Sequence, residues 1–171
     1  MQKLLLILGL IVLNACTSLP PKQQGTLRVL SYNIRHGADA SWKMRLEDQA
    51  QFLASRKADL IALQEVDKNC KRSGSVDQPQ FFGEELNMQP VFQAFMPFNG
   101  GQYGIAALSK LPVLEVTQSY STETAETEPR KLPLVKVLLA EQPAIFVSVH
   151  FDWHENNTVR KKQVRQLLAD L

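Results

Sequence analysis

The sequence predicts a mixed α/β (α+β) domain built from layers of helices and strands. Short apolar runs bounded by polar residues, such as Leu60–Leu63, are typical of strands that are covered on both faces. Longer segments, such as Lys43–Lys57, repeat apolar residues at helical spacing. Because both kinds of element occur near both ends of the chain, a layered mixed domain follows.

Length and composition allow one globular domain. The chain has 171 residues, which suffices for a sizeable core. Its hydrophobic content of 44% and charged content of 21% are ordinary for a globular protein. The formal net charge of +2 is too small to indicate a dedicated nucleic-acid-binding protein, which usually presents a strongly basic face.

The N-terminal residues predict a signal peptide over residues 1–15. Met1–Lys3 is a short positive segment, and Leu4–Leu13 is an apolar segment too short for a good transmembrane span. The following Leu13-Asn14-Ala15-Cys16 resembles a bacterial lipobox, which predicts cleavage before Cys16 and a diacylglycerol group on its thiol. The alternative is an ordinary secretory signal with a cysteine near its cleavage site.

Residues 16–26 are expected to form the lipidated cysteine and a tether, marked by Pro20-Pro21. The lipid chains on Cys16 would anchor the protein to a membrane of the bacterial cell envelope without spanning it. Thr17 supplies no acidic retention signal. This favours the outer membrane, facing the periplasm, over the inner membrane.

The domain itself is expected to begin at residue 27. Leu27–Asn33 predicts a strand, His36–Asp39 a loop, and Lys43–Lys57 an amphipathic helix that leads to the strand Leu60–Leu63. A strand, helix and strand in this order imply a right-handed βαβ unit with parallel strands.

The rest of the chain continues the mixed pattern. Pro79–Leu86 predicts a second helix, and Asn99–Gly104 a turn-rich loop. Val164, Leu167, Leu168 and Leu171 form the apolar stripe of a last helix over Thr158–Leu171. The further predicted strands are Val91–Met96, Ile105–Ser109, Val113–Tyr120, Leu134–Leu139 and Ala144–Phe151, with a polar loop over Ser121–Glu128 and a hairpin turn at Glu141-Gln142-Pro143.

Two oxygen-bearing side chains follow the first two strands. Asn33 ends the strand Leu27–Asn33, and Glu65 comes just after the strand Leu60–Leu63. If these strands are parallel, both side chains lie at the same edge of the sheet, where ligands of α/β sheets gather. Two oxygen ligands there form half of a site for a hard cation such as Mg²⁺.

The segments Leu27–Gly37 and Ala58–Asp67 resemble the first two motifs of the endonuclease/exonuclease/phosphatase superfamily, the DNase I-like metal-dependent phosphodiesterases. The resemblance implies that Asn33 and Glu65 contact a catalytic Mg²⁺ or Mn²⁺. It also implies a four-layer sandwich of two packed mixed β-sheets flanked by helices, incomplete in this chain.

Further segments extend the resemblance. Gly101–Lys110 resembles the family's Gly-containing turn and strand, with a structural role. Glu128-Pro129-Arg130 resembles the segment that places an arginine near the scissile phosphate, where Arg130 would donate bidentate hydrogen bonds. Val147–Asp152 resembles the strand ending in Thr-His-Leu, which implies that His150 stabilises the phosphate or its transition state. A structural role of a histidine at a strand end is the alternative.

Weaker matches add candidates for substrate binding. His36 follows Asn33 closely, and Arg72 lies in a loop that resembles one bacterial branch of the family. Gln163 matches the family's helix after the histidine strand, although a helix surface suffices to explain it. Cys70 lies in a polar loop beside Lys71 and Arg72, which favour its thiolate, but an incidental free thiol is the preferred interpretation.

The family's Gly-Asp-x-Asn motif and its C-terminal Asp-His pair are missing from the sequence. The resemblance therefore covers residues 27–171 as about the first two-thirds of a family domain. The expected function is metal-dependent hydrolysis of a phosphodiester or phosphomonoester, impaired by the missing groups. The alternative is a non-catalytic, lipid-anchored remnant that binds phosphate or metal. Nucleic acid, phospholipid and inositol phosphate remain open as substrates, and no protein partner is evident.

Overall fold

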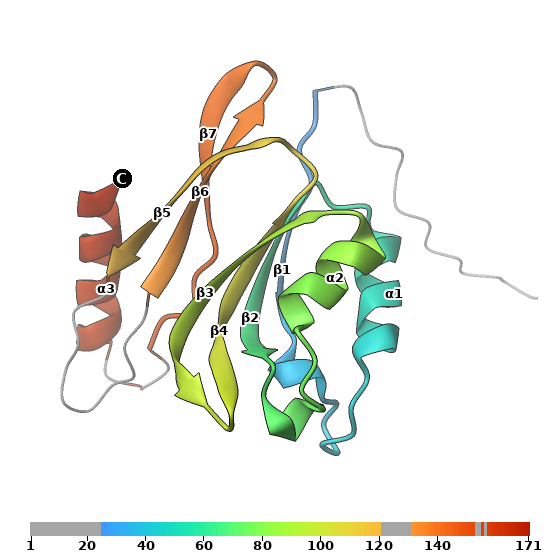
Figure 1. The fold of residues 1–171 in the computed structure, drawn as a ribbon. Helices are drawn as coiled ribbons and strands as arrows, with labels where there is room; N and C mark the ends of the chain where they lie inside the picture. The colour runs from blue at the N-terminus through green and yellow to red at the C-terminus, as the bar shows by residue number, and fades with distance from the viewer. Residues whose placement is uncertain (1–24, 121–130, 153–154, 156) are drawn as a thin grey trace, which may run out of the picture.

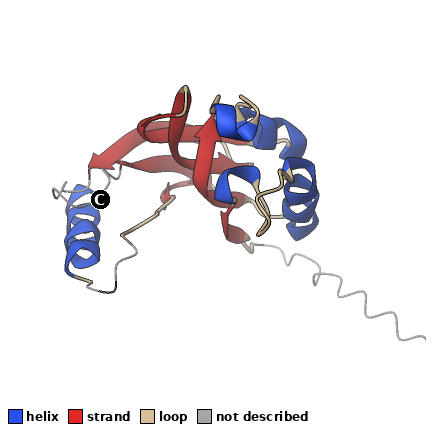
Figure 2. Cartoon of the chain, turned by 90° about the horizontal axis from the view of Figure 1, so that it is seen from below, coloured by secondary structure: helices blue, strands red, loops and turns tan. Residues whose placement is uncertain are grey.

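The computed structural model describes residues 25–120, 131–152, 155 and 157–171. The elements are, in chain order, β1 (Val29–Asn33), η1 (Arg35–Gly37), α1 (Leu46–Arg56), β2 (Leu60–Lys68), η2 (Lys71–Ser73), α2 (Gln78–Leu86), β3 (Gln89–Phe98), β4 (Gly101–Ser109), β5 (Val113–Tyr120), β6 (Lys131–Leu139), β7 (Gln142–Val147) and α3 (Thr158–Asp170). Two β-sheets pack against each other, with α1 and α2 on one side of the molecule and α3 on the other (Figures 1 and 2). The fold is an α+β sandwich.

The first sheet has the strand order β1-β2-β4-β3. β1 and β2 are parallel, with Val29 opposite Leu60 and Asn33 opposite Gln64. β4 is antiparallel to both β2 and β3, so this sheet is mixed. The parallel pair confirms the predicted βαβ unit and places the end of β1 beside the middle of β2.

The two helices on the first sheet form where the sequence predicts them. α1 buries Leu46, Ala50 and Leu53 and ends at Lys57, which has a left-handed φ of 52°. α2 begins at Asp77, whose side chain accepts a hydrogen bond from the backbone N–H of Gln80 at 3.2 Å. The apolar faces of both helices pack on the sheet with its Ile61, Leu63, Val66 and Leu108, and α2 contributes the fully buried Phe82.

The second sheet, β5-β6-β7, is antiparallel. The predicted hairpin between its last strands is confirmed, but its turn residues are Ala140 and Glu141, while Gln142 and Pro143 of the predicted turn already belong to β7. Leu60 and Ala107 of the first sheet meet Val135 and Val137 of the second, and this contact forms the core between the sheets. Within the described residues, no helix has the length and apolar character needed to cross a membrane.

Several strand boundaries differ from the prediction, and those of β2 and β4 matter most for the site. β2 continues past Leu63 to Lys68, so Glu65 lies inside the strand rather than after it. β4 begins at Gly101, where the glycines predicted a loop. A Cβ at Gly104 would collide with the backbone carbonyl oxygen of Gln93, and one at Gly101 with that of Lys68. These glycines therefore permit close approach of neighbouring strands rather than a turn.

The C-terminal part also differs from the prediction. β7 ends at Val147, opposite Leu134, so His150 lies beyond the strand. The apolar run misled the prediction because Val149 and Phe151 still pack against the core, although they no longer pair. Leu168 of α3 and Leu171 directly after it are 66% and 56% exposed. The buried residue of α3 is Gln163, whose side chain accepts a hydrogen bond from the N–H of Asp152 at 2.9 Å.

Candidate functional site

A β-bulge in β2 determines where Glu65 points. Leu63 is opposite Ala106 and Val66 is opposite Gly104, so Gln64 and Glu65 together face a single residue of β4. In an unbroken strand, Glu65 would share the face of Ile61 and Leu63, which is packed under the helices. The bulge puts Val66 into that core instead. The carboxylate of Glu65 therefore points away from that core and toward Asn33.

Asn33 and Glu65 are in direct contact. Asn33 Nδ2 donates a hydrogen bond to Glu65 Oε1 at 2.8 Å. Asn33 Oδ1 accepts a hydrogen bond from the backbone N–H of Arg35 at 2.9 Å, which fixes the orientation of the amide. The two residues that the sequence placed at one sheet edge therefore lie side by side. In this position Glu65 has a left-handed φ of 57°, which is a strained backbone conformation for a non-glycine residue.

The η1 turn places His36 next to the pair. Arg35 and His36 have φ values of 48° and 46°. A Cβ on the following Gly37 would lie 2.7 Å from Leu46 Cδ2, so only glycine fits there. His36 is buried, and its ring stacks on that of Trp42 at 5.6 Å between centroids. Burial lowers the pKa of His36 below its ordinary value of 6.5, and the positive charge of Arg72 lowers it further. The carboxylates of Asp67 and Glu65 act in the opposite direction but do not cancel these two effects. The imidazole is therefore neutral at neutral pH.

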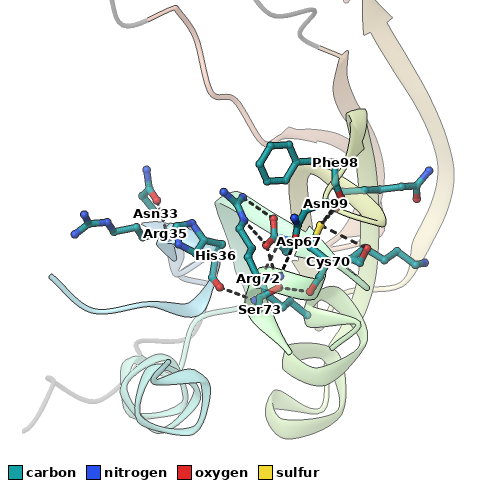
Figure 3. Close-up of polar contacts among 12 residues, drawn as sticks. Asn33, Arg35, His36, Asp67, Cys70, Arg72, Ser73, Phe98 and Asn99 are labelled. Carbon is teal, nitrogen blue, oxygen red and sulfur yellow. Dashed lines mark hydrogen bonds and ion pairs between the residues drawn. The ribbon is translucent and has the colours of Figure 1, made fainter. Parts of the chain in front are cut away.

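A buried carboxylate holds Arg72 in place (Figure 3). Asp67, fully buried, accepts hydrogen bonds from Arg72 Nε and Nη2, both at 2.7 Å, and from Ser73 Oγ at 2.9 Å. The bidentate geometry raises the pKa of Arg72, so the guanidinium stays charged. The Asp67 N–H donates to Gln78 Oε1, and Gln78 Nε2 donates to the backbone oxygen of His36 at 2.7 Å. This network connects β2, α2 and η1.

Aromatic rings surround the guanidinium of Arg72. Its Cζ atom lies 4.4 Å from the ring centroid of Phe98 and 5.4 Å from that of Tyr103. The backbone N–H of Arg72 donates to Asn99 Oδ1 at 2.7 Å. The loop that carries Arg72 is thus fixed to the turn between β3 and β4. Arg72 lies where a phosphate next to Glu65 could accept its remaining N–H groups.

Cys70 does not have the reactive environment that its basic neighbours predict. The residue is fully buried, and its Sγ lies 3.2 Å from the backbone oxygen of Phe98 and 3.3 Å from that of Gln102. Burial and the charge of Asp67 raise the pKa of the thiol. The less favoured alternative, a thiolate stabilised by Lys71 and Arg72, does not hold, because sequence neighbours do not show how deeply a side chain is buried. The interpretation as an unreactive thiol agrees with this position.

Some of the side chains described above line a pocket of about 290 Å³. Its polar wall is formed by Glu65, His36 and Arg72. Its apolar wall consists of Trp42, Met96, Phe98 and Tyr103. A larger hollow of about 530 Å³ lies between α2 and the β4–β5 connection, but apart from the surface residues Glu84 and Lys110 its lining carries no charged group. The smaller pocket therefore has the better combination of groups for binding a charged ligand.

The predicted site residues are only partly brought together. Glu65, His36 and Arg72 line the pocket, and Asn33 is hydrogen-bonded to Glu65 beside it. His150, half-buried after β7, is not among the residues that line it. Arg130, Cys16, the signal peptide, the loop over Ser121–Glu128 and most of the tether lie outside the described residues.

The oxygen donors fit a hydrated hard cation. Asn33 Oδ1 uses one lone pair for the Arg35 N–H and keeps a second. Mg²⁺ typically retains several waters and takes one or two protein carboxylates, here Glu65. Within the described part of the chain, no three His, Cys, Asp or Glu residues form a metal-binding group. The donor set therefore fits Mg²⁺ or Mn²⁺ better than zinc, which takes three or four protein ligands.

Sequence reasoning missed two features of the site. Asp67 was not singled out, although it is the buried partner of Arg72. Trp42 was not singled out either, although a tryptophan in a polar loop close to Asn33 is a visible signal. The aromatic wall from β3 and β4 could not be foreseen, because it depends on a tertiary contact.

Comparison with known proteins agrees with the fold. A search of curated protein sequences finds no match. The endonuclease/exonuclease/phosphatase family protein from Leptotrichia buccalis C-1013-b is similar with a TM-score of 0.67 and 17% identity, over 85% of this chain and 63% of that one. D. rerio TDP2 in complex with a single-strand DNA product has a TM-score of 0.61 and 19% identity, over 84% of this chain and 54% of that one. ANGEL2, a 2′,3′-cyclic phosphatase, has a TM-score of 0.61 and 16% identity, over 86% of this chain and 51% of that one.

The chain thus spans between 51% and 63% of the length of these three structures. At such identities the likeness concerns the fold. The sequence comparison goes further, because residues 30–171 match the Endonuclease/Exonuclease/phosphatase family. This match covers more than half of the chain, and the chain therefore belongs to the Endonuclease/Exonuclease/phosphatase family.

Proposed function

We propose that this chain carries the metal-binding half of a phosphoesterase site that hydrolyses phosphodiesters or phosphomonoesters with Mg²⁺ or Mn²⁺. The observation that carries the proposal is the Glu65 carboxylate, which a strained bulge holds against Asn33 at the pocket. Strained backbone at a non-glycine residue persists when the surrounding structure enforces it, and such residues cluster at functional sites. Membership in the family supports the reaction class.

Asn33 and Glu65 would hold the cation through their side-chain oxygens. A bound Mg²⁺ or Mn²⁺ supplies Lewis-acid stabilisation of charge on the phosphoryl and leaving oxygens. The Asn33–Glu65 hydrogen bond orients both side chains before a ligand arrives. This preorganisation lowers the cost of binding.

Arg72 and His36 would contact the substrate phosphate. Arg72 keeps its charge because Asp67 is bonded to it, and a guanidinium pairs well with phosphate oxygens. His36 is neutral, so one ring nitrogen donates and the other accepts a hydrogen bond. Arg130 and His150 are proposed from the family resemblance to stabilise the phosphoryl charge further.

The second candidate function is binding of phosphate or metal without turnover. It is favoured by one observation: within the described residues, the pocket contains Glu65 as its single carboxylate. If Glu65 holds the cation, no second carboxylate at the pocket is left to activate water. This candidate predicts that phosphate esters bind but are not hydrolysed.

Lipid anchoring through Cys16 remains a proposal about location. It rests on the Leu13-Asn14-Ala15-Cys16 sequence and places the protein in the bacterial cell envelope, at the outer membrane facing the periplasm. The mass of the mature N-terminal peptide distinguishes a lipidated Cys16 from an ordinary secretory signal that is cleaved near this cysteine. A diacylglycerol on Cys16 supports the anchor, and an unmodified N-terminus at another residue contradicts it.

The test compares Glu65→Gln with a matched control, Glu85→Gln. Glu85 is exposed on α2, away from the pocket. Mg²⁺ binding is measured by calorimetry and hydrolysis with bis(p-nitrophenyl) phosphate and p-nitrophenyl phosphate. Glu65→Gln is expected to weaken Mg²⁺ binding at least about tenfold and to abolish any metal-dependent turnover, because it removes the one carboxylate that lines the pocket in the described part of the chain.

The control variant should behave like the wild type. If Glu65→Gln and Glu85→Gln bind Mg²⁺ equally well, the metal site is wrong. If the wild type binds Mg²⁺ and phosphate esters without hydrolysing either substrate, the non-catalytic alternative is supported instead.

A further inference from the structure

The apolar wall of the pocket has no role in holding a metal or a phosphate. Trp42 is 66% exposed and Phe98 is 36% exposed, and both line the pocket that contains Glu65. Exposing large aromatic rings to water is unfavourable, and such rings at a polar site usually serve a ligand. This wall is therefore the feature of the site that the proposed function leaves unexplained.

Trp42 is held in a fixed position although it is exposed. Its ring stacks on His36 with an interplanar angle of 20°, and the guanidinium of Arg35 lies 4.3 Å from its centroid. The loop beneath it is tied by Asp39, which accepts hydrogen bonds from Ser41 N at 2.8 Å, Ser41 Oγ at 2.7 Å and Lys43 N at 3.0 Å. These bonds lower the pKa of Asp39, so the carboxylate that organises the loop stays charged. An indole held in this way loses little entropy when a planar ring stacks on it.

The charges around the aromatic rings decide which ligand they suit. A quaternary ammonium headgroup would need rings without a cation of their own. Here Arg72 already lies over Phe98 and Tyr103, and Arg35 lies over Trp42. These two cations repel a choline-type headgroup but favour a planar, electron-rich ring attached to an anionic phosphate.

We infer that the pocket binds a nucleotide, with its phosphate at Arg72 and at the cation that Glu65 and Asn33 would hold, and with its base against Trp42. The inference rests on the proposed function, because the phosphate end is the site described above. The volume of about 290 Å³ suits one nucleotide rather than a long strand. The net charge of +2 agrees with this, since a duplex reader usually presents a large basic face. The substrate class is accordingly a small nucleotide ester or the terminal nucleotide of a single strand.

The test compares adenosine 5′-monophosphate with ribose 5-phosphate, which has the same sugar and phosphate but no base. Binding of both to the 171-residue chain is measured by calorimetry in the presence of Mg²⁺. Base–aromatic stacking predicts that the adenosine compound binds about tenfold more tightly. Trp42→Ala is expected to bring the affinity ratio of the two compounds close to one, because it removes the base contact from only one of them; loss of the stacking on His36 affects both compounds alike. Trp42→Phe, which retains an aromatic ring, is expected to keep part of the difference.

Phe52→Ala is the matched control. Phe52 is an aromatic residue of α1 that is 41% exposed and does not line the pocket. It should leave both affinities unchanged. Equal binding of the two compounds by the wild type, or equal effects of Trp42→Ala and Phe52→Ala, overturns the base subsite. Phosphocholine binding more tightly than adenosine 5′-monophosphate overturns it in favour of a lipid headgroup.

Glu65→Gln separates this inference from the proposed function. This variant should bind both adenosine 5′-monophosphate and ribose 5-phosphate more weakly. The ratio of the two affinities should stay near that of the wild type, because the contact with the base is intact. If the wild type binds neither compound, the phosphate site itself is wrong and the base subsite with it. If the wild type binds both compounds with equal affinity, the phosphate site is supported and the base subsite is wrong.

Discussion

The two sheets of this protein differ in how completely they are covered. The first sheet packs against α1 and α2 on one face and against the second sheet on the other. In the second sheet, Leu114, Val116 and Ile145 are 52%, 49% and 51% exposed. The candidate site lies entirely on the better covered sheet and its loops. The comparison teaches that the strained strand residue of the site, Glu65, occurs in the sheet whose packing on both faces can enforce it.

Backbone strain follows the same division. Arg35, His36, Trp42 and Glu65 have positive φ values around the pocket. In the described part of the second sheet, Ala140 and Glu141 have positive φ, and both are the turn residues of a hairpin. Such values are expected in a tight hairpin turn, whereas in the middle of β2 they need support from the surrounding core.

The largest expected effect tests the difference in packing. Phe82→Ala removes a fully buried ring from the core under α2 and should lower the free energy of unfolding by about 3–5 kcal/mol. Phe146→Ala removes the same ring from a partly buried position on β7 and should cost only about 1–2 kcal/mol. Urea denaturation of both variants measures the two values. Equal losses would show that the second sheet is as well packed as the first.

An intermediate effect tests the strain at the bulge. At a φ of 57°, glycine is more favourable than alanine, so Glu65→Gly should be more stable than Glu65→Ala by about 1 kcal/mol. Ala62→Gly, at a regular position of the same strand, should instead cost about 1 kcal/mol. Denaturation of the three variants gives the comparison. The bulge is unstrained if glycine is the worse residue at both positions.

The smallest expected effect concerns pH. Because burial lowers the pKa of His36 below 6.5, the unfolded chain binds a proton there before the folded chain does. The neutral His36 therefore favours the folded state fully above pH 6.5, and this contribution is lost as the pH falls below that value. His36→Asn, which tolerates the positive φ, should flatten this part of the stability profile. Urea denaturation midpoints of both proteins, measured between pH 5 and pH 8, cover the range in which a histidine ordinarily titrates and test this prediction. Parallel pH profiles of the wild type and the variant would contradict it.

Much of the fold could be predicted from the sequence. The apolar spacing of Leu46, Ala50 and Leu53 fixes the buried face of α1, and the strand, helix and strand order implies the parallel pair β1 and β2. The predictions failed where local pattern and tertiary contact disagree. Val149 and Phe151 are apolar without being paired, and Gln163 is polar yet buried. A pattern of side chains along the chain reports burial, but it does not report which backbone groups pair.

For the site, the sequence by itself determined which side chains are available: the Asn33 amide, the Glu65 carboxylate, His36 and Arg72. Only the tertiary structure decided how they meet. The bulge turns Glu65 away from the core and toward Asn33, and Asp67 fixes Arg72 from a fully buried position. The physical reason is that strand periodicity alone would have put Glu65 under the helices. The register of β2 against β4, set by packing of Val66 and by the close approach at Gly104, overrides that periodicity.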